Sequence, residues 1–178
     1  MVPTRDQREW TTTNPLGFAD WVRTIDRRSG GLDHFGDGYF VRSITYMKRW
    51  RDHLFGERSA VSSILLVTML GKHDPASPLE YYPPLENPLF PQYQAEAAYL
   101  YDMLRLTYSC IQQPMSGAFN NPTLPSEDLA RGWDQTYLAL FLQRLNACIV
   151  NLWNGIVSHT EADAIQHYKR AHGGTFPP

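Results

Sequence analysis

Cysteines are scarce in this sequence of 178 residues, and the common metal and cofactor motifs are absent. Its two cysteines, Cys110 and Cys148, lie within long segments of helical apolar periodicity. We therefore expect two free core thiols rather than the alternative of a disulfide. The sequence holds no CxxC, HExxH, GxGxxG, P-loop or GxSxG pattern. The sequence therefore carries no motif that would indicate a common zinc site, a dinucleotide-binding fold, a P-loop enzyme or a serine hydrolase.

Long hydrophobic runs are also absent. The longest apolar run, residues 64–70, is interrupted by Thr68 and is far shorter than the roughly 20 residues that span a bilayer. The first ten residues hold no apolar stretch of the kind that a signal peptide needs. We therefore expect a cytoplasmic protein that has no membrane partner.

A strong excess of positive charge is lacking as well. Lys and Arg number 16 against 18 Asp and Glu, for a formal net charge of −2. This balance argues against a nucleic-acid partner, which attracts strongly basic proteins. Residues 1–58 nevertheless hold ten Lys or Arg against eight Asp or Glu, a net of +2. Four of these cations lie on one predicted helix: Arg42, Lys48, Arg49 and Arg51.

What is present is helical periodicity in a globular composition, with 43% hydrophobic and 19% charged residues. No segment alternates apolar and polar residues over the length of a strand. We predict an all-α fold, a bundle of five or six helices with proline-rich connecting loops, in a single domain over residues 1–178. The predicted helices span residues 18–28, 39–55, 60–71, 93–111, 129–156 and 161–171.

Two segments are expected to lack regular structure. Residues 1–16 form an extended lead-in that ends around Pro15, because a residue before proline disfavours helical geometry. Residues 72–91 hold six prolines and form a rigid connector. This connector is either a linker or a loop that wraps the bundle, and we favour the loop because its aromatic residues can pack down.

Capping residues set the expected helix ends. In 39–55, an apolar stripe predicts an amphipathic helix that ends at Gly56; the stripe consists of Phe40, Ile44, Met47 and Leu54, widened by Tyr39, Tyr46 and Trp50. Ser126 is the expected N-cap of the helix over 129–156. Thr160 and Asp163 resemble a capping box for the last helix.

The segment 60–71 is apolar on every side, so its periodicity does not separate a buried strand from a buried helix. We favour a helix because of its length and because Ser62 and Ser63 lie near its start. Gly71 would end it.

The neighbouring predicted helices over residues 39–55 and 60–71 offer a candidate anion site. Lys48 and Arg51 are three residues apart and share a helix face. The hydroxyls of Ser62 and Ser63, with nearby backbone N–H groups, could meet an anion at the helix N-terminus. Together they could hold a triphosphate tail. The alternative is a solvated cationic face beside an ordinary N-cap.

Three stretches carry a family resemblance. Residues Val41–Asp52 read VRSITYMKRWRD and are followed by the Ser-led apolar segment Ser62–Leu66. Upstream, Trp10–Trp21 fits the pattern W-x-x-x-NP-x-G-[FY]-x-x-W. Downstream come Asn121-Pro122, Glu127-Asp128-Leu129, Trp133 and Gly173–Phe176. In this order they resemble the helical half of nucleotidyltransferases related to cyclic GMP-AMP synthase and 2′-5′ oligoadenylate synthetase, whose bacterial members are called CD-NTases.

The resemblance implies roles for few residues. Lys48 matches the family lysine that contacts the donor triphosphate, and Ser63, or else Ser62, matches the serine that assists it. Arg51 is included in the candidate site only because it shares a helix face with Lys48. The position after the serine often bears a tyrosine that stacks on the base, but here it is Ile64, so stacking from that position is not expected.

The catalytic half of the family has no counterpart in the sequence. That half carries a Gly-Ser turn and carboxylates that hold two Mg²⁺ ions, whereas this chain has no Gly-Ser dipeptide, and Glu161–Asp163, its nearest acidic triplet, opens a helix. The resemblance thus implies a nucleotide-pocket lobe, a fragment or split subunit, that is not catalytic alone and binds no cofactor by itself. Its partners would be a catalytic nucleotidyltransferase lobe or chain and nucleoside triphosphates, with Mg²⁺ in the complete enzyme.

Further expectations distinguish the nucleotide-pocket lobe from the alternative functions. If a partner lobe is missing, part of the face around Lys48 and Trp50 is expected to be apolar and exposed, favouring association. One alternative is a stand-alone, non-catalytic helical module that binds a protein partner or a nucleotide. A weaker one is nucleic-acid binding by the helix that carries Arg42 and Arg51, which the net acidity opposes.

Overall fold

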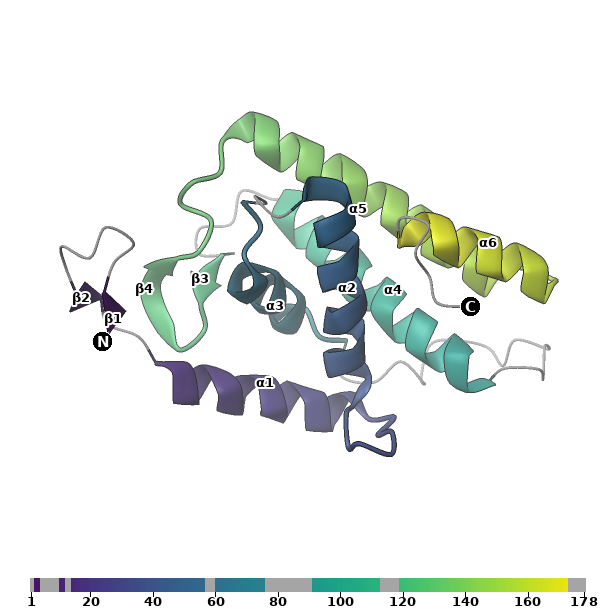
Figure 1. The fold of residues 1–178 in the computed structure, drawn as a ribbon, viewed down its shortest axis with the longest axis horizontal. Coiled ribbons are helices and arrows are strands. Elements are labelled where there is room, and N and C mark those ends of the chain that lie inside the picture. Colours follow the sequence, from purple (N-terminus) through teal and green to yellow (C-terminus); the bar gives the residue numbers. More distant parts are fainter. Residues whose placement is uncertain are drawn as a thin grey trace.

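The computed structural model describes residues 2–3, 10–11, 14–56, 60–75, 91–112 and 119–172. Over these residues the predicted all-α class is confirmed: six helices dominate, beside two small two-stranded antiparallel sheets (Figure 1). The helices are α1 (Pro15–Ser29), α2 (Tyr39–Phe55), α3 (Ser63–Lys72), α4 (Pro91–Gln112), α5 (Gln135–Ile156) and α6 (Glu161–Ala171). The sheets pair β1 (Val2–Pro3) with β2 (Trp10–Thr11), and β3 (Asn120–Asn121) with β4 (Leu124–Asp128).

Helix α3 lies at the centre of the bundle, with α2 and α4 packed against it (Figure 1). Every residue from 65 to 71 is buried, which explains why this segment is apolar on all sides. The prediction of a helix here is confirmed. The largest fully buried side chains come from α2, α3, α4 and α5, and include Trp50, Leu65, Tyr99 and Phe141. The core therefore lies between these four helices.

Helix α2 spans the predicted residues, and Gly56 ends it with a φ of 67°. Phe40, Ile44 and Met47 are buried as predicted, but Leu54 is 37% exposed. Trp50 takes that place in the core at 1% exposure, in edge contact with the rings of Phe55 and Phe141. Trp50 was also predicted to lie on the apolar side of this helix and is buried as expected, whereas Leu54 is not.

The predicted role of Gly71 as a helix stop is wrong, because α3 continues through Lys72. Gly71 instead allows α1 and α3 to approach closely. A Cβ atom at this position would lie 2.5 Å from the Trp21 ring and 2.9 Å from Ile25 Cδ1. Glycine is required here by packing rather than by a turn.

The first helix begins earlier than predicted, so the expected extended lead-in over 1–16 is wrong at its last two residues. Asn14 is the N-cap, and its side chain accepts a hydrogen bond from the Gly17 N–H at 3.1 Å. Pro15 occupies the first turn, where its missing N–H costs nothing. The restriction that proline places on Asn14 fits the non-helical geometry of an N-cap.

The predicted start of the long C-terminal helix is also wrong. Ser126 does not cap a helix but lies in strand β4, and α5 begins at Gln135 with Asp134 as its N-cap. Glu127 accepts a hydrogen bond from the Asn121 side chain at 2.7 Å rather than facing a helix dipole. Pro125, which disfavours a helix interior, accepts a bond from the Asn120 side chain in the same hairpin.

Helix α6 begins where the capping pattern predicts. The Thr160 hydroxyl accepts a bond from the Asp163 N–H at 3.1 Å and donates to the Asp163 carboxylate at 2.7 Å. The predicted connector over 72–91 lies mostly outside the described residues, as do Gly173 and the residues after it.

The two cysteines are free, as predicted. Cys148 is buried in the core, and this burial raises the pKa of its thiol to about 12. Cys110 is only partly buried, so the expectation of a core position is confirmed for Cys148 alone.

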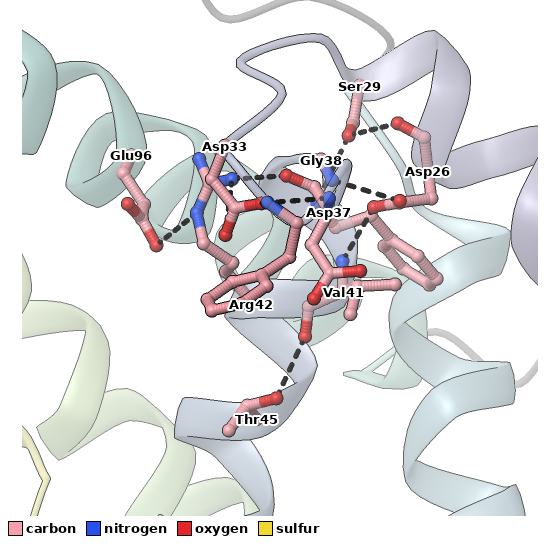
Figure 2. A network of polar contacts seen from close by, with 11 residues as sticks. Asp26, Ser29, Asp33, Asp37, Gly38, Val41, Arg42, Thr45 and Glu96 are labelled. Atoms are coloured by element: carbon pink, nitrogen blue, oxygen red, sulfur yellow. Dashed lines mark hydrogen bonds and ion pairs between the residues drawn. The ribbon is translucent and has the colours of Figure 1, made fainter.

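The end of α1 caps the beginning of α2 (Figure 2). Asp26 is 8% exposed, and its carboxylate accepts hydrogen bonds from the Gly38 and Val41 N–H groups, each at 2.9 Å. The Ser29 hydroxyl accepts from the Phe40 N–H at 3.0 Å and donates to the Asp26 carbonyl. Two N–H groups of the first turn of α2 and that of its N-cap, Gly38, are thus satisfied by side chains of α1.

Candidate functional site

The predicted anion-site residues come from the second half of α2 and from the N-cap and first turn of α3, two helices that pack against each other. Three of them are joined by contacts or capping bonds at this junction: Arg51 from α2 and Ser62 and Ser63 from α3. Lys48 lies one turn before Arg51 on the same side of α2. The proximity of the two helices, which the sequence only suggested, is a feature of the fold.

Arg51 is the link between the two helices. Its side chain is 12% exposed, and its Nη1 donates to the Ser63 Oγ at 2.9 Å and to the Val61 carbonyl at 3.3 Å. Its Nε donates to the Asp52 carboxylate at 2.8 Å, and Nη2 lies 2.6 Å from the same oxygen. Most N–H donors of the Arg51 guanidinium therefore bond to groups within the protein. These bonds hold α3 against α2.

Ser62 and Ser63 play different parts. Ser62 is the N-cap of α3, and its hydroxyl oxygen accepts from the Leu65 N–H at 3.2 Å. The Ser63 oxygen accepts from Arg51, and within the described residues its own O–H donates to no acceptor, so it is available as a donor. Both serines are exposed. Among the described residues, the N–H groups of Ser63 and Ile64 have no acceptor, as is usual in the first turn of a helix.

Lys48 is the cation of this site that remains available. It is partly exposed, and within the described residues no carboxylate lies at ion-pair distance from it. The neighbouring Arg49 is exposed on a different side of the helix. Lys48 on α2, and the Ser63 hydroxyl with two backbone N–H groups at the start of α3, are therefore the candidate anion donors that the two helices offer.

Arg42, the fourth cation of this helix, is not part of the site. Its side chain is 16% exposed and bonds to the Glu96 carboxylate at 3.1 Å and to the Asp37 carbonyl (Figure 2). It also lies 5.1 Å from the centre of the Tyr39 ring. Because Arg42 and Arg51 are both paired internally, the positive face that could attract a nucleic acid is smaller than the sequence indicates.

The expected apolar, exposed face around Lys48 and Trp50 is wrong with respect to Trp50, which is 1% exposed. The exposed apolar side chains near this edge are Leu54 at 37% and Ile64 at 36%. These two are modestly exposed and flank the site rather than forming a broad patch. One argument for a missing partner lobe at this face is thereby removed.

An aromatic cluster around Trp133 fixes the approach to α3. Trp133 Nε1 donates to the Ala60 carbonyl at 3.1 Å. Its ring contacts those of Phe119, Tyr137 and Phe141 at centroid distances of 5.6, 5.2 and 5.0 Å. The turn that leads into Ser62 is therefore held in place, a long-range contact for which the sequence gives no local signal.

The described residues offer few other sites. A small cleft of about 60 Å³ lies between α2, α4, α5 and α6, with Leu100, Leu152 and Tyr168 in its wall; pockets that hold small-molecule ligands are usually about 300 Å³ or larger. Across the described ranges, no group of three His, Cys, Asp or Glu residues is arranged to hold a metal ion.

A membrane-crossing segment was not expected from the sequence. None of the described helices has both the length and the apolar character that crossing a lipid bilayer requires.

Comparison with known proteins adds no family assignment. No protein-family model matches the sequence, and no curated protein matches it significantly.

Proposed function

We propose that this chain is the helical nucleotide-pocket lobe of a CD-NTase-like cyclic oligonucleotide synthase of bacterial anti-phage defence, not catalytic by itself. The observation that carries the proposal is the junction of α2 and α3. There Lys48 has no ion-pair partner among the described residues, and Arg51 fixes the Ser63 hydroxyl at 2.9 Å. The order of the family-like segments along the chain supports the same assignment.

In this function the junction binds the triphosphate of a nucleotide. The Lys48 ammonium attracts the phosphate oxygens, and the Ser63 O–H and the N–H groups at the start of α3 donate to them. Arg51 does not bind the phosphate in this scheme, because four of its five N–H donors are taken by Asp52, Ser63 and the Val61 carbonyl. It positions Ser63 instead, which revises its predicted role as a ligand.

The chemistry of nucleotidyl transfer belongs to the catalytic lobe or chain in this proposal. The Mg²⁺ ions of the complete enzyme would be held by carboxylates of that partner, since the described part of this chain has no cluster of three metal-ligating side chains. The contribution of this lobe is to hold the donor triphosphate and to close one wall of the pocket.

Replacing Lys48 with glutamine is expected to weaken the binding of inorganic tripolyphosphate to the 178-residue chain by about tenfold or more. A hydrogen bond to a charged group contributes about 1.5–3 kcal/mol, and 1.4 kcal/mol corresponds to about a tenfold change in Kd. Titration calorimetry at about 0.15 M salt, where the Debye length is about 8 Å, measures the change.

The variant Arg49→Gln is the matched control, because it removes one positive charge from the adjacent residue on another side of α2. We expect its affinity to stay within about twofold of the parent, since exposed charges are screened by salt. Equal losses in the two variants would show that only the overall charge attracts the anion. An unchanged affinity for Lys48→Gln would remove the proposed site.

A stand-alone helical module that binds a protein partner or a nucleotide is the second candidate function. The burial of Trp50 favours it, since a lobe separated from its partner is expected to expose a larger apolar face than Leu54 and Ile64 provide. The two functions differ in genetic context. A neighbouring reading frame that encodes a Gly-Ser turn and an Asp-x-Asp strand supports the split enzyme, and its absence supports the module.

A further inference from the structure

Helix α5 has an outer face that is unusually poor in charge. The helix lies along one edge of the bundle (Figure 1), and among its residues 135–156 only Arg144 is charged. Its inner face, with Phe141, Leu145 and Leu152, is buried in the core. An outward helix face in a globular protein is normally lined by charged residues. The outer face of α5 therefore has the composition of a contact surface rather than of a solvated one.

The outward residues follow a regular repeat, and we call them the outer seam. Leu140, Val150 and Val157 are 40%, 49% and 39% exposed. Gln143 and Ala147 are also exposed, and Asn154 is partly buried. The seam consists of Leu140, Gln143, Ala147, Val150, Asn154 and Val157. The successive steps of three and four residues are the a and d spacing by which two helices pair along a common seam.

We propose that the outer seam is covered by a second copy of this chain, with the two α5 helices antiparallel. This arrangement places Leu140 against Val157, Gln143 against Asn154, and Ala147 against Val150. Each apolar layer then matches a larger with a smaller side chain, and each polar layer pairs two amides. Pairs of buried amides fix the register of such helix pairs.

The distribution of charge favours a second copy of the chain as the partner and an antiparallel orientation of the two helices. The seam carries no charged side chain, so a charged partner helix would lose hydration without gaining an ion pair. In a parallel pair in register, the two Arg144 side chains would lie side by side. In the antiparallel pair they lie nine residues apart along the axis, about 14 Å at 1.5 Å per residue, so their repulsion is screened.

Trp153 borders the seam and enlarges it. It is 41% exposed, and its ring is held by that of Tyr101 at a centroid distance of 5.2 Å. Fixed aromatic side chains of this kind are enriched among residues that dominate binding energy. One helix pair nevertheless buries less than the roughly 800 Å² per partner of a standard interface, so we expect a weak dimer.

Sedimentation equilibrium of the 178-residue chain tests this inference independently of the phosphate site, because it measures mass alone. From about 1 to about 500 µM, a range that covers weak association, the mean mass is expected to rise from 20.4 kDa toward twice that value. Val150→Glu is expected to keep the chain monomeric throughout, because it buries unpaired charges in the two central layers. Circular dichroism verifies that this variant stays folded.

Two further variants make the test specific. Leu32→Glu removes a residue that is 63% exposed on a loop outside the seam, and its association should match that of the parent. Ala147→Lys alone should be monomeric, whereas mixing it with Val150→Glu should restore association through a Lys–Glu pair. A parent that is monomeric at every concentration, or a Val150→Glu variant that still dimerises, overturns the proposal. Failure of the folded, mixed variants to associate overturns the antiparallel register.

Discussion

Replacing Asp26 with alanine is expected to lower the free energy of unfolding by about 2–4 kcal/mol, because a buried unsatisfied donor costs about 1–3 kcal/mol. The Asp26 carboxylate accepts the N–H groups of both Gly38 and Val41, and it is 8% exposed. Gly38, the N-cap of α2, has no side chain that could take over this role. Without Asp26, two donors at the start of α2 are left without acceptors in a buried place.

Urea denaturation measures this loss, and Asp20→Ala is its control. Asp20 lies on the same helix and pairs with Arg23 on the surface, where both side chains are more than half exposed. An exposed pair of this kind contributes about 0–1 kcal/mol, so the control should retain nearly full stability. If the two variants lose the same small amount, Asp26 does not cap α2.

The capping by Asp26 also bears on the candidate site. Helix α2 carries Lys48 and Arg51, and its first turn is fixed to α1 through Asp26 and Ser29 (Figure 2). Its other end is fixed to α3 through Arg51. The orientation of Lys48 is thus set by two anchors at opposite ends of one helix.

The stability of the fold is expected to fall by about 2–3 kcal/mol between pH 7 and pH 4.5 through His172 alone. Burial lowers the pKa of His172 from 6.5 to about 4. Above pH 6.5 the imidazole is neutral in both states and its contribution is fully present. As the pH falls toward 4, the unfolded chain binds a proton that the folded chain does not, so stability is lost at about 1.4 kcal/mol per unit of pKa difference.

Denaturation of the parent and of His172→Gln at the two pH values isolates this effect. The variant should lose about 2–3 kcal/mol less than the parent between pH 7 and pH 4.5, because it lacks the titrating group. His53→Gln, an exposed residue in the last turn of α2, should behave like the parent. A parent and a His172→Gln variant with equal pH dependence would contradict the lowered pKa.

The fold could be predicted from the sequence where local signals act alone. Helix α2 was predicted residue by residue, since its apolar stripe and Gly56 are both local features. The start of α5 was not, because Ser126 and Asp134 are both good N-cap residues and only the pairing of β3 with β4 decides between them. The burial of Trp50 in place of Leu54 likewise depends on rings from another helix.

The candidate site was predicted in part. The sequence named Lys48, Arg51, Ser62 and Ser63, and the structure places Arg51 in contact with Ser63. The sequence did not indicate that most N–H donors of Arg51 bond to groups such as Asp52 and the Val61 carbonyl, because such pairing depends on how the two helices pack. The cap from Asp26 to Val41 spans 15 residues and has no helical periodicity that a sequence pattern could reveal.

The intact mass of the natively expressed protein, measured together with any chain that co-purifies, tests the central claim most directly. If this chain is the helical lobe of a nucleotide second-messenger synthase, the native product is longer at its N-terminus, or it is accompanied by a second chain with a Gly-Ser turn and metal-binding carboxylates. That assembly should consume nucleoside triphosphates when Mg²⁺ is added. A native chain of 20.4 kDa that purifies alone would contradict the account.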